Sequence, residues 1–157
     1  MKRILIFSDT HNDTTSPMKV IMQTKAVDAI IHAGDCVRDA QDLEAMFPQI
    51  PVYYVMGNND FFSNAPRALN VTIGKKNIFI VHGHNERVKY EYTLSTLIEK
   101  GQRQMADLIV FGHTHKPLID YHKNMTILNP GSLKYGGTYA VCEIENDKLK
   151  VEIKNYR

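Results

Sequence analysis

Short runs of apolar, β-prone residues alternate along the chain with clusters of Asp, His, Asn and Gly. The alternation occurs five times, at residues 4–11, 29–35, 52–60, 78–84 and 108–115. Apolar runs of this length, bounded by glycine and polar residues, are typical of buried strands. The pattern therefore predicts five strands, each ending in a polar loop.

Three candidate helices lie between or after these runs, at residues 17–27, 40–47 and 94–105. Ser16 precedes Pro17, which favours Ser16 as the N-cap of the first helix. The third helix has an apolar face that we expect to pack in the core, formed by Leu94, Leu97, Ile98 and Met105. A strand–helix–strand order predicts a parallel α/β core.

The pattern changes in the last third of the chain. Residues 126–128, 138–144 and 148–153 are typical of strands, and Asn146-Asp147 predicts a turn between the last two. We therefore expect this part to be largely antiparallel, and the whole protein to combine mixed sheets with helices outside. No linker or internal repeat divides the 157 residues, so we expect a single domain over residues 1–157.

The polar clusters contain pairs of candidate metal ligands two residues apart, namely Asp9 and His11, His82 and His84, and His113 and His115. If strand geometry continues to these residues, both members of a pair point the same way. All five clusters fall beyond the carboxyl ends of predicted strands, where open α/β sheets bind ligands. One histidine alone would be weak evidence, but burying many polar groups together is costly unless something binds them. A pair of metal ions bound to these polar groups would offset that cost.

The types of residue present narrow the choice of metal, the possible partners and the expected location. Imidazole and carboxylate ligands suit manganese, iron, zinc, cobalt or nickel rather than calcium. Cys36 and Cys142 form no CxxC pair, which argues against a structural zinc site or a disulfide framework. Lys and Arg number 19 against 17 Asp and Glu, without long basic runs, so specific nucleic-acid binding is not indicated. The first apolar run is too short for a signal peptide or a membrane span, and we expect a cytoplasmic location.

The same clusters carry motifs in a fixed order. They are DTH at residues 9–11, GD at 34–35, GNND at 57–60, HGH at 82–84 and GHTH at 112–115. Across nearly the whole chain they resemble the motifs of the calcineurin-like metallophosphoesterases. The short length and the NPGS at residues 129–132 are similar to the small YfcE-like phosphodiesterase branch of that family. The resemblance implies an α/β fold, a four-layer sandwich of two mixed β-sheets flanked by helices.

Carried over position by position, the resemblance implies two divalent ions per chain, manganese first, with nickel, zinc, iron or cobalt as alternatives. One ion would be held by Asp9, His11 and His115, and the other by Asn58, His82 and His113, with Asp35 bridging them. Two ions roughly 3.5–4 Å apart can clamp a phosphate ester and provide a bridging hydroxide for in-line attack. The expected activity is hydrolysis of a small phosphodiester. Relatives often self-associate, which leaves a homodimer open.

One position departs from the family pattern. Many members have histidine where this chain has Asn59, and that histidine is commonly assigned to leaving-group protonation. Asparagine cannot act as this acid, and a general acid contributes roughly 10²- to 10⁴-fold. His84 is the best substitute donor in the sequence, against a plainer role as a hydrogen-bonding neighbour of the ligands. Asp60 would orient Asn59 or His84, or else cap a turn.

Three further polar residues have plainer interpretations. His32 falls inside a predicted strand and is expected to be a hydrogen-bonded core residue. Arg38 follows the GD motif and could contact a phosphate, although a solvated loop arginine is the commoner case. His122 has no assigned role.

Two other functions fit parts of this pattern. Some proteins that resemble the family, such as the retromer scaffold subunit, keep the fold but lose ligands and activity. Here no ligand position is substituted, and only Asn59 favours a catalytically weak metal-binding interaction scaffold. A mononuclear metallohydrolase acting on a non-phosphate ester or amide would need about three protein ligands. Metal analysis separates these hypotheses, because a dinuclear site predicts about two ions per chain.

Overall fold

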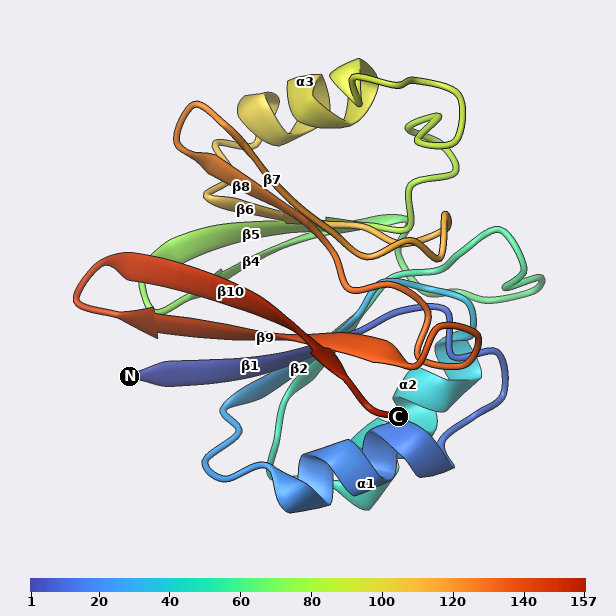
Figure 1. The fold of residues 1–157 in the computed structure, drawn as a ribbon. Coiled ribbons are helices and arrows are strands. Elements are labelled where there is room, and N and C mark those ends of the chain that lie inside the picture. The colour runs from blue at the N-terminus through green and yellow to red at the C-terminus, as the bar shows by residue number, and fades with distance from the viewer.

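Two β-sheets face each other in the computed structural model, and helices cover both outer surfaces (Figure 1). The structure describes residues 1–157. The helices are α1 (Thr15–Gln23), α2 (Val37–Met46) and α3 (Ser95–Arg103). α1 and α2 lie below the first sheet in Figure 1, and α3 lies above the second. The predicted four-layer α/β sandwich is confirmed.

The first sheet has five strands in the order β10-β9-β1-β2-β3. They are β1 (Lys2–Phe7), β2 (Ala29–His32), β3 (Val52–Tyr54), β9 (Thr138–Glu145) and β10 (Lys148–Asn155). β1, β2 and β3 are parallel, whereas β9 runs antiparallel to β1 and β10. Asn146 and Asp147 join β9 to β10 with positive φ at both positions, which is the tight hairpin turn that the sequence predicts.

The second sheet has five strands in the order β4-β5-β6-β8-β7. They are β4 (Ala68–Ile73), β5 (Lys76–Val81), β6 (Leu108–Val110), β7 (Leu118–His122) and β8 (Met125–Asn129). β8 is parallel to β6, so the expected antiparallel arrangement of the last third is wrong for this pair. β4 and β7 were not predicted. Both are edge strands with no buried residue, so their apolar pattern is weak.

The main core lies between the sheets and contains 14 buried residues, among them Ile6 and Ile31 of the first sheet and Ile80 and Val110 of the second. β-branched side chains suit these strands because they pack well on a pleated surface. Two smaller clusters join the first sheet to α1 and α2 and the second sheet to α3. Burying one such side chain contributes roughly 1.5–3 kcal/mol. Each strand therefore ends where the buried apolar run gives way to polar residues, and the polar loop begins there.

The helices differ in detail from the prediction. α1 begins one residue before Ser16, so Ser16 does not cap it; its N–H and hydroxyl donate to Asp13 instead. Pro17 fits because first-turn residues have no intrahelical partner for an N–H. Leu97 of α3 is buried as expected, but Met105 lies beyond the end of the helix and is 76% exposed. No helix is both long and apolar enough to cross a membrane.

Candidate metal centre

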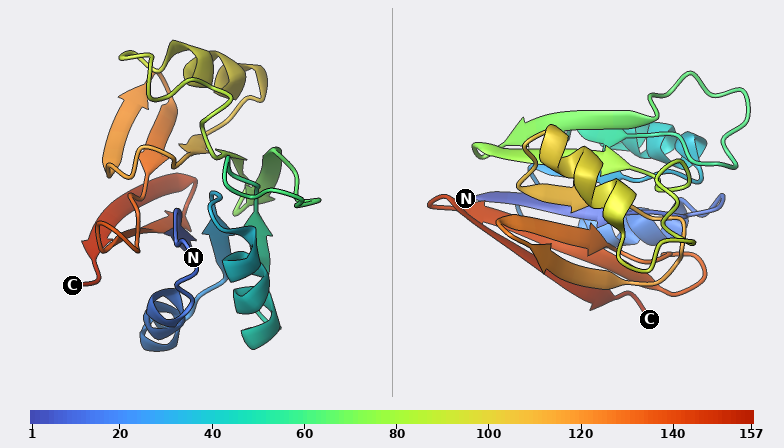
Figure 2. Two further views of the ribbon diagram at one scale, coloured as in Figure 1. Left: turned by 90° about the vertical axis from the view of Figure 1, so that its right-hand side faces the viewer. Right: turned by 90° about the horizontal axis from the view of Figure 1, so that it is seen from above.

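Polar loops from both sheets meet at the carboxyl edge of the parallel strands, which faces the viewer at the left of Figure 2. The first sheet supplies the loops that carry Asp9, His11, Asp35 and Asn58. The second sheet supplies the loops that carry His82, His113 and His115. The candidate ligands therefore gather at one edge, and neither sheet holds them all.

The backbone of these loops is not extended. β1 ends at Phe7, and Asp9 and His11 have φ of 54° and 43°, in the left-handed region. His113 and His115 also have positive φ, at 70° and 62°. The argument from continuing strand geometry is therefore wrong for both pairs, and sharp loop turns make the side chains converge instead. Such conformations cost roughly 1–3 kcal/mol each and gather at functional sites.

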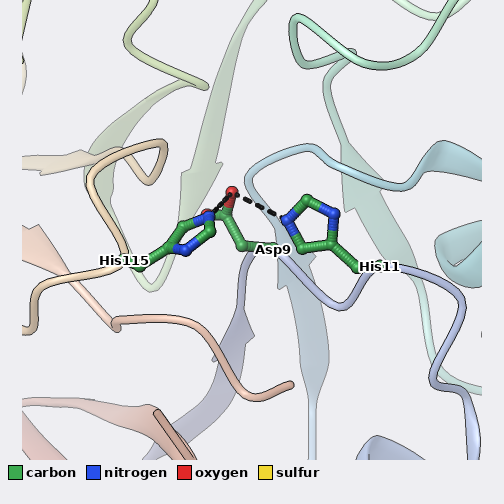
Figure 3. Close-up of side chains that lie close together, drawn as sticks. All are labelled: Asp9, His11 and His115. Atoms are coloured by element: carbon green, nitrogen blue, oxygen red, sulfur yellow. Dashed lines mark ion pairs between the residues drawn. The ribbon is translucent and has the colours of Figure 1, made fainter. Parts of the chain in front are cut away.

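Asp9, His11 and His115 form a first set of converging donors, the outer group (Figure 3). The Nε2 atoms of His11 and His115 lie 3.7 and 3.2 Å from Asp9 Oδ1, and Figure 3 shows the two rings on either side of the carboxylate. Two ligands about 2.1 Å from a shared ion are roughly 3.0–3.4 Å apart. The spacing of the outer group is close to that value.

Asp9, Asp35 and His82 form a second set, the inner group, and all of them are buried. His82 Nε2 lies 3.8 Å from Asp9 Oδ1 and 3.5 Å from Asp35 Oδ2. Asn58 Oδ1 lies 3.0 Å from the same nitrogen. Asp9 thus belongs to both groups, and the two groups form one continuous set of donors.

Two atoms of the outer group test whether these residues fit a metal ion. Asp9 Oδ1 and His11 Nε2 are shielded from solvent and have no hydrogen-bond partner. A buried carboxylate oxygen without a partner is costly, and a cation would remove that cost. Neither group contains a thiolate, and oxygen with imidazole nitrogen is typical of catalytic rather than closed structural sites. The residues present therefore fit a divalent transition-metal ion.

Hydrogen bonds hold the rest of these side chains in place. Asp9 Oδ2 accepts from the Ser8 hydroxyl at 2.6 Å and from the backbone N–H of His113 at 3.0 Å. His82 Nδ1 donates to the Ala33 carbonyl at 2.7 Å, which links the two sheets. This bond leaves His82 Nε2 facing the carboxylates, as second bonds of metal-binding imidazoles commonly do.

Two motif glycines let the carboxylates approach the backbone. A Cβ at Gly112 would collide with the Ser8 hydroxyl and lie 2.5 Å from Asp9 Oδ2. A Cβ at Gly57 would collide with Asp35 Oδ1. Only glycine leaves room for these contacts, which explains why it precedes His113 and Asn58 in the two motifs.

The acids and histidines of the site shift each other's pKa values. Burial opposes ionisation of Asp35, but hydrogen bonds from His82 and Asn59 outweigh it and lower the pKa of Asp35. Burial also opposes protonation of His82, yet its hydrogen bond to Asp35 and the charge of Asp9 raise the pKa of His82 overall. Burial and the charge of His82 lower the pKa of His113 to about 4. A proton and a metal ion would therefore compete for His82 Nε2.

The loop at residues 57–60 supports Asp35. Asn59 donates to both Asp35 oxygens, from its backbone N–H at 3.0 Å and from Nδ2 at 2.8 Å. The buried Asp60 carboxylate accepts from the backbone N–H groups of Asp35, Val37 and Gly57. Asp60 forms no hydrogen bond with the side chain of Asn59 or with His84, so it does not orient them as predicted. Its backbone donors make it a loop-capping carboxylate, the plainer alternative.

His84 lies beside the donor groups. Its ring centre is 5.6 Å from that of His82 and 6.1 Å from that of His113. His84 Nδ1 is shielded from solvent and has no hydrogen-bond partner. Burial and the charge of His82 lower the pKa of His84. His113 is also outside both groups, with its ring 5.1 Å from that of His82.

The NPGS segment contributes support that the sequence pattern did not reveal. The Ser132 hydroxyl donates to the Asp9 carbonyl at 2.8 Å and accepts from the Tyr135 N–H at 3.0 Å. The Tyr135 ring stacks on His115 with centres 5.5 Å apart and lies 5.1 Å from the His11 ring. The only sequence signal was the motif itself, since Tyr135 lies outside every ligand cluster.

His32 is the hydrogen-bonded core residue that the sequence predicts. It is fully buried, its Nδ1 accepts from the Gly34 N–H at 3.2 Å, and its Nε2 donates to the Thr10 hydroxyl at 2.9 Å. The Thr10 hydroxyl in turn donates to Asp39. Burial, reinforced by the charge of His82, lowers the pKa of His32 to about 3. This chain of bonds braces the turn between Asp9 and His11 from within.

Known proteins are similar in sequence to this chain over most of its length. The model of the calcineurin-like phosphoesterase superfamily domain matches residues 1–147. The probable metallophosphoesterase YsnB of Bacillus subtilis is 31% identical over 155 residues, which cover 94% of this chain and 88% of that protein. The phosphodiesterase MJ0936 of Methanocaldococcus jannaschii is 28% identical over 147 residues, or 82% of each chain.

Solved structures share the fold. A predicted phosphoesterase from Streptococcus pneumoniae superposes with a TM-score of 0.83 at 26% identity, covering 99% of this chain and 90% of that one. Vps29 of Entamoeba histolytica, solved in complex with Zn²⁺, has a TM-score of 0.74 over 99% of both chains, but at 17% identity it shows the fold alone. The sequence match, the fold and the two donor groups agree, and the chain belongs to the calcineurin-like phosphoesterase superfamily.

Proposed function

We propose that this protein is a dinuclear, metal-dependent phosphodiesterase that hydrolyses small phosphodiesters, with manganese as its foremost metal. The proposed ligands are the seven predicted residues, Asp9, His11, Asp35, Asn58, His82, His113 and His115. A phosphodiesterase among the relatives, at 28% identity, supports the substrate class. The converging donors of the inner and outer groups support the metal requirement.

The observation that carries the proposal is the pair of buried, unpartnered atoms, Asp9 Oδ1 and His11 Nε2. The protein brings these atoms together although neither gains a hydrogen bond. Asp9 holds its other oxygen with two hydrogen bonds, so Oδ1 is presented in a fixed direction. This arrangement is expected where a side chain is oriented to bind a cation rather than to form a hydrogen bond within the protein.

Charge then favours a phosphate ester as substrate. When bound, two divalent ions would neutralise phosphate oxygens and lower the pKa of a water that attacks phosphorus in line. Asp9 and Asp35 are the only carboxylates among the proposed ligands, so they would offset about two of four positive charges. Although burial opposes ionisation of Asp35, His82 and then the two hydrogen bonds from Asn59 lower its pKa and favour the anion. The remaining positive charge suits an anionic diester.

His84 is the proposed source of the leaving-group proton. Asn59 is an unsuitable source because its amide is not acidic, and it donates hydrogen bonds to Asp35 instead. His84 lies next to His82 and His113 and keeps an unpartnered Nδ1. Asn59 would then position Asp35, and Asp60 would position the loop backbone, without contacting the reacting atoms.

The test is metal loading followed by turnover. Chelator-treated protein reloaded with Mn²⁺ should hold about two ions per chain and hydrolyse bis-p-nitrophenyl phosphate. Asp35→Asn or His82→Ala should abolish that turnover, while His122→Ala, a histidine on β7 outside both groups, should not change it. One ion per chain would contradict the dinuclear site. A loaded protein without turnover would favour the interaction scaffold.

The role of His84 needs its own measurement. His84→Ala should leave the metal content intact and reduce turnover most for esters with poor leaving groups, because a proton donor matters most there. The comparison is phenyl against p-nitrophenyl leaving groups, with the pH profile recorded for each. An unchanged leaving-group dependence and pH profile would remove His84 from the mechanism.

A further inference from the structure

A hollow of about 720 Å³ opens beside the candidate metal centre, between the segment at residues 88–94 and the segment at residues 111–118. Thr114 lines it and lies between the proposed ligands His113 and His115. Phe111, which directly follows β6, also lines it. The volume is within the range of about 300–1,000 Å³ that holds small ligands. None of the proposed ligands lines the hollow, but through Thr114 it shares a loop with two of them.

The walls of this hollow are held in place without a ligand. On one side, Glu91 accepts hydrogen bonds from the Ser95 hydroxyl and from the N–H and hydroxyl of Thr96, which fixes the segment to α3. On the other side, the Thr114 hydroxyl accepts bonds from Asn129 Nδ2 at 3.0 Å and from the Lys116 N–H at 3.2 Å. A site held this way can bind without first ordering its loops.

The lining is aromatic and apolar. Tyr90 and Tyr92 are 79% and 103% exposed, although large aromatic side chains are usually covered when they only support a core. Behind them, Val88 and Phe111 are buried and form an apolar base. Flat ligands stack on exposed tyrosines of this kind.

The charge around the hollow is positive. Lys89 and Lys116 line it, and the Tyr90 ring lies 5.7 Å from the guanidinium of Arg87. The one acid in the lining, Glu91, lies 3.8 Å from the Arg87 guanidinium, so these two charges offset each other and the two lysines leave the hollow positive. A ring attached to a negatively charged phosphodiester matches both the aromatic lining and this charge.

We propose that this hollow binds an aromatic ester group of the substrate, so that the enzyme prefers phosphodiesters carrying a flat ring over those carrying small alkyl groups. This inference rests on the proposed phosphodiesterase function. Two kinds of ring share the required chemistry, a simple aryl group and a nucleobase. Tyr90 and Tyr92 are the specificity-determining residues.

The test keeps the leaving group constant. Three p-nitrophenyl phosphodiesters, whose second ester group is methyl, phenyl or 5′-thymidyl, are compared by kcat/KM on Mn²⁺-loaded protein. The phenyl or thymidyl ester should exceed the methyl ester by roughly tenfold or more, since stacking of one ring on tyrosine changes affinity by about this factor. The better of the two rings identifies the source. Tyr90→Ala combined with Tyr92→Ala should bring the ratio close to one.

Matched controls separate this pocket from general effects. Tyr121→Ala removes an exposed tyrosine of β7 that does not line the hollow, and it should leave the ratio unchanged. Phe61→Ala with Phe62→Ala removes another exposed aromatic pair, which lines a different hollow beside Asn59. If the phenylalanine pair rather than the tyrosine pair sets the ratio, or if wild-type protein shows no preference, the proposal is overturned.

Binding separates failure of this inference from failure of the proposed function. If loaded protein turns over none of the esters, calorimetric titration with diphenyl phosphate and dimethyl phosphate still tests the hollow. Tighter binding of diphenyl phosphate that disappears in the double tyrosine variant would support the pocket while the phosphodiesterase proposal fails. Equal affinities would overturn the pocket.

Discussion

The inner and outer groups share Asp9 but are held in different ways. In the inner group, Asp35 and His82 are 2% and 1% exposed, and both are fixed by hydrogen bonds. In the outer group, His11 and His115 are partly exposed, and their main aromatic neighbour is Tyr135. The same kinds of donor therefore occur once in a rigid, dry setting and once in an adjustable, wetter one.

This difference has consequences for metal binding. Donors that are already oriented lose little freedom when an ion arrives, and electrostatic attraction is stronger away from water. We therefore expect the inner group to bind its ion more tightly than the outer group. Substitutions in the two groups should differ in the same direction.

The largest effect is expected where the groups overlap. Asp9→Asn should remove most metal binding and lower turnover of bis-p-nitrophenyl phosphate by at least roughly a thousandfold, because both donor groups lose the charged oxygen that they share. The metal-free variant should be as stable as wild type or more stable, since it no longer buries an unpartnered carboxylate oxygen. Metal content and thermal unfolding with and without Mn²⁺ measure both effects. A metal-free variant much less stable than wild type would contradict the interpretation that the unpartnered Asp9 oxygen costs stability.

A paired substitution compares the groups directly. His82→Ala should weaken metal binding and also destabilise the metal-free protein by about 1–3 kcal/mol, because the buried Ala33 carbonyl loses its partner. His115→Ala should weaken metal binding with little change in metal-free stability, because its ring is partly exposed. Denaturant unfolding in chelator and calorimetric Mn²⁺ titration test the pair. Equal stability losses would remove the distinction between the groups.

The support beneath the turn between Asp9 and His11 should be sensitive to acid. The folded-state pKa of His32 is lowered to about 3 from its ordinary 6.5, so the unfolded chain binds the proton first as the pH falls. The contribution to stability is present above pH 6.5 and declines below it, by about 2 kcal/mol between pH 6.5 and 4.5. Unfolding free energies of chelator-treated wild type and His32→Gln at several pH values isolate this effect. Parallel pH dependences would argue against it.

The smallest effect is expected at the edge of the outer group. Tyr135→Ala should reduce Mn²⁺ affinity by less than about tenfold, because the ring only orients His115 and His11 from outside. Tyr135→Phe keeps the ring and should behave as wild type. A loss in the phenylalanine variant would assign the role to the hydroxyl instead. Calorimetric titration of both variants makes the comparison.

Local sequence patterns predicted much of the frame. The buried runs that became β1, β2, β5 and β6 are continuous and apolar, so burial and β-propensity agree along each of them. The edge strands β4 and β7 lack this signal because neither contains a buried residue. The orientation of β8 was beyond local reasoning, since strand direction depends on which neighbour a strand pairs with.

The sequence by itself determined which side chains end the strands and that carboxylates, imidazoles and no thiolates would gather there. Only the tertiary structure decided that Asp9 belongs to both groups, that Ala33 of one sheet orients His82 of the other, and that Asp60 holds backbone rather than a catalytic side chain. The physical reason is distance along the chain. Hydrophobic periodicity is encoded within a few residues, whereas His82 and Ala33 are 49 positions apart and meet only when two sheets pack.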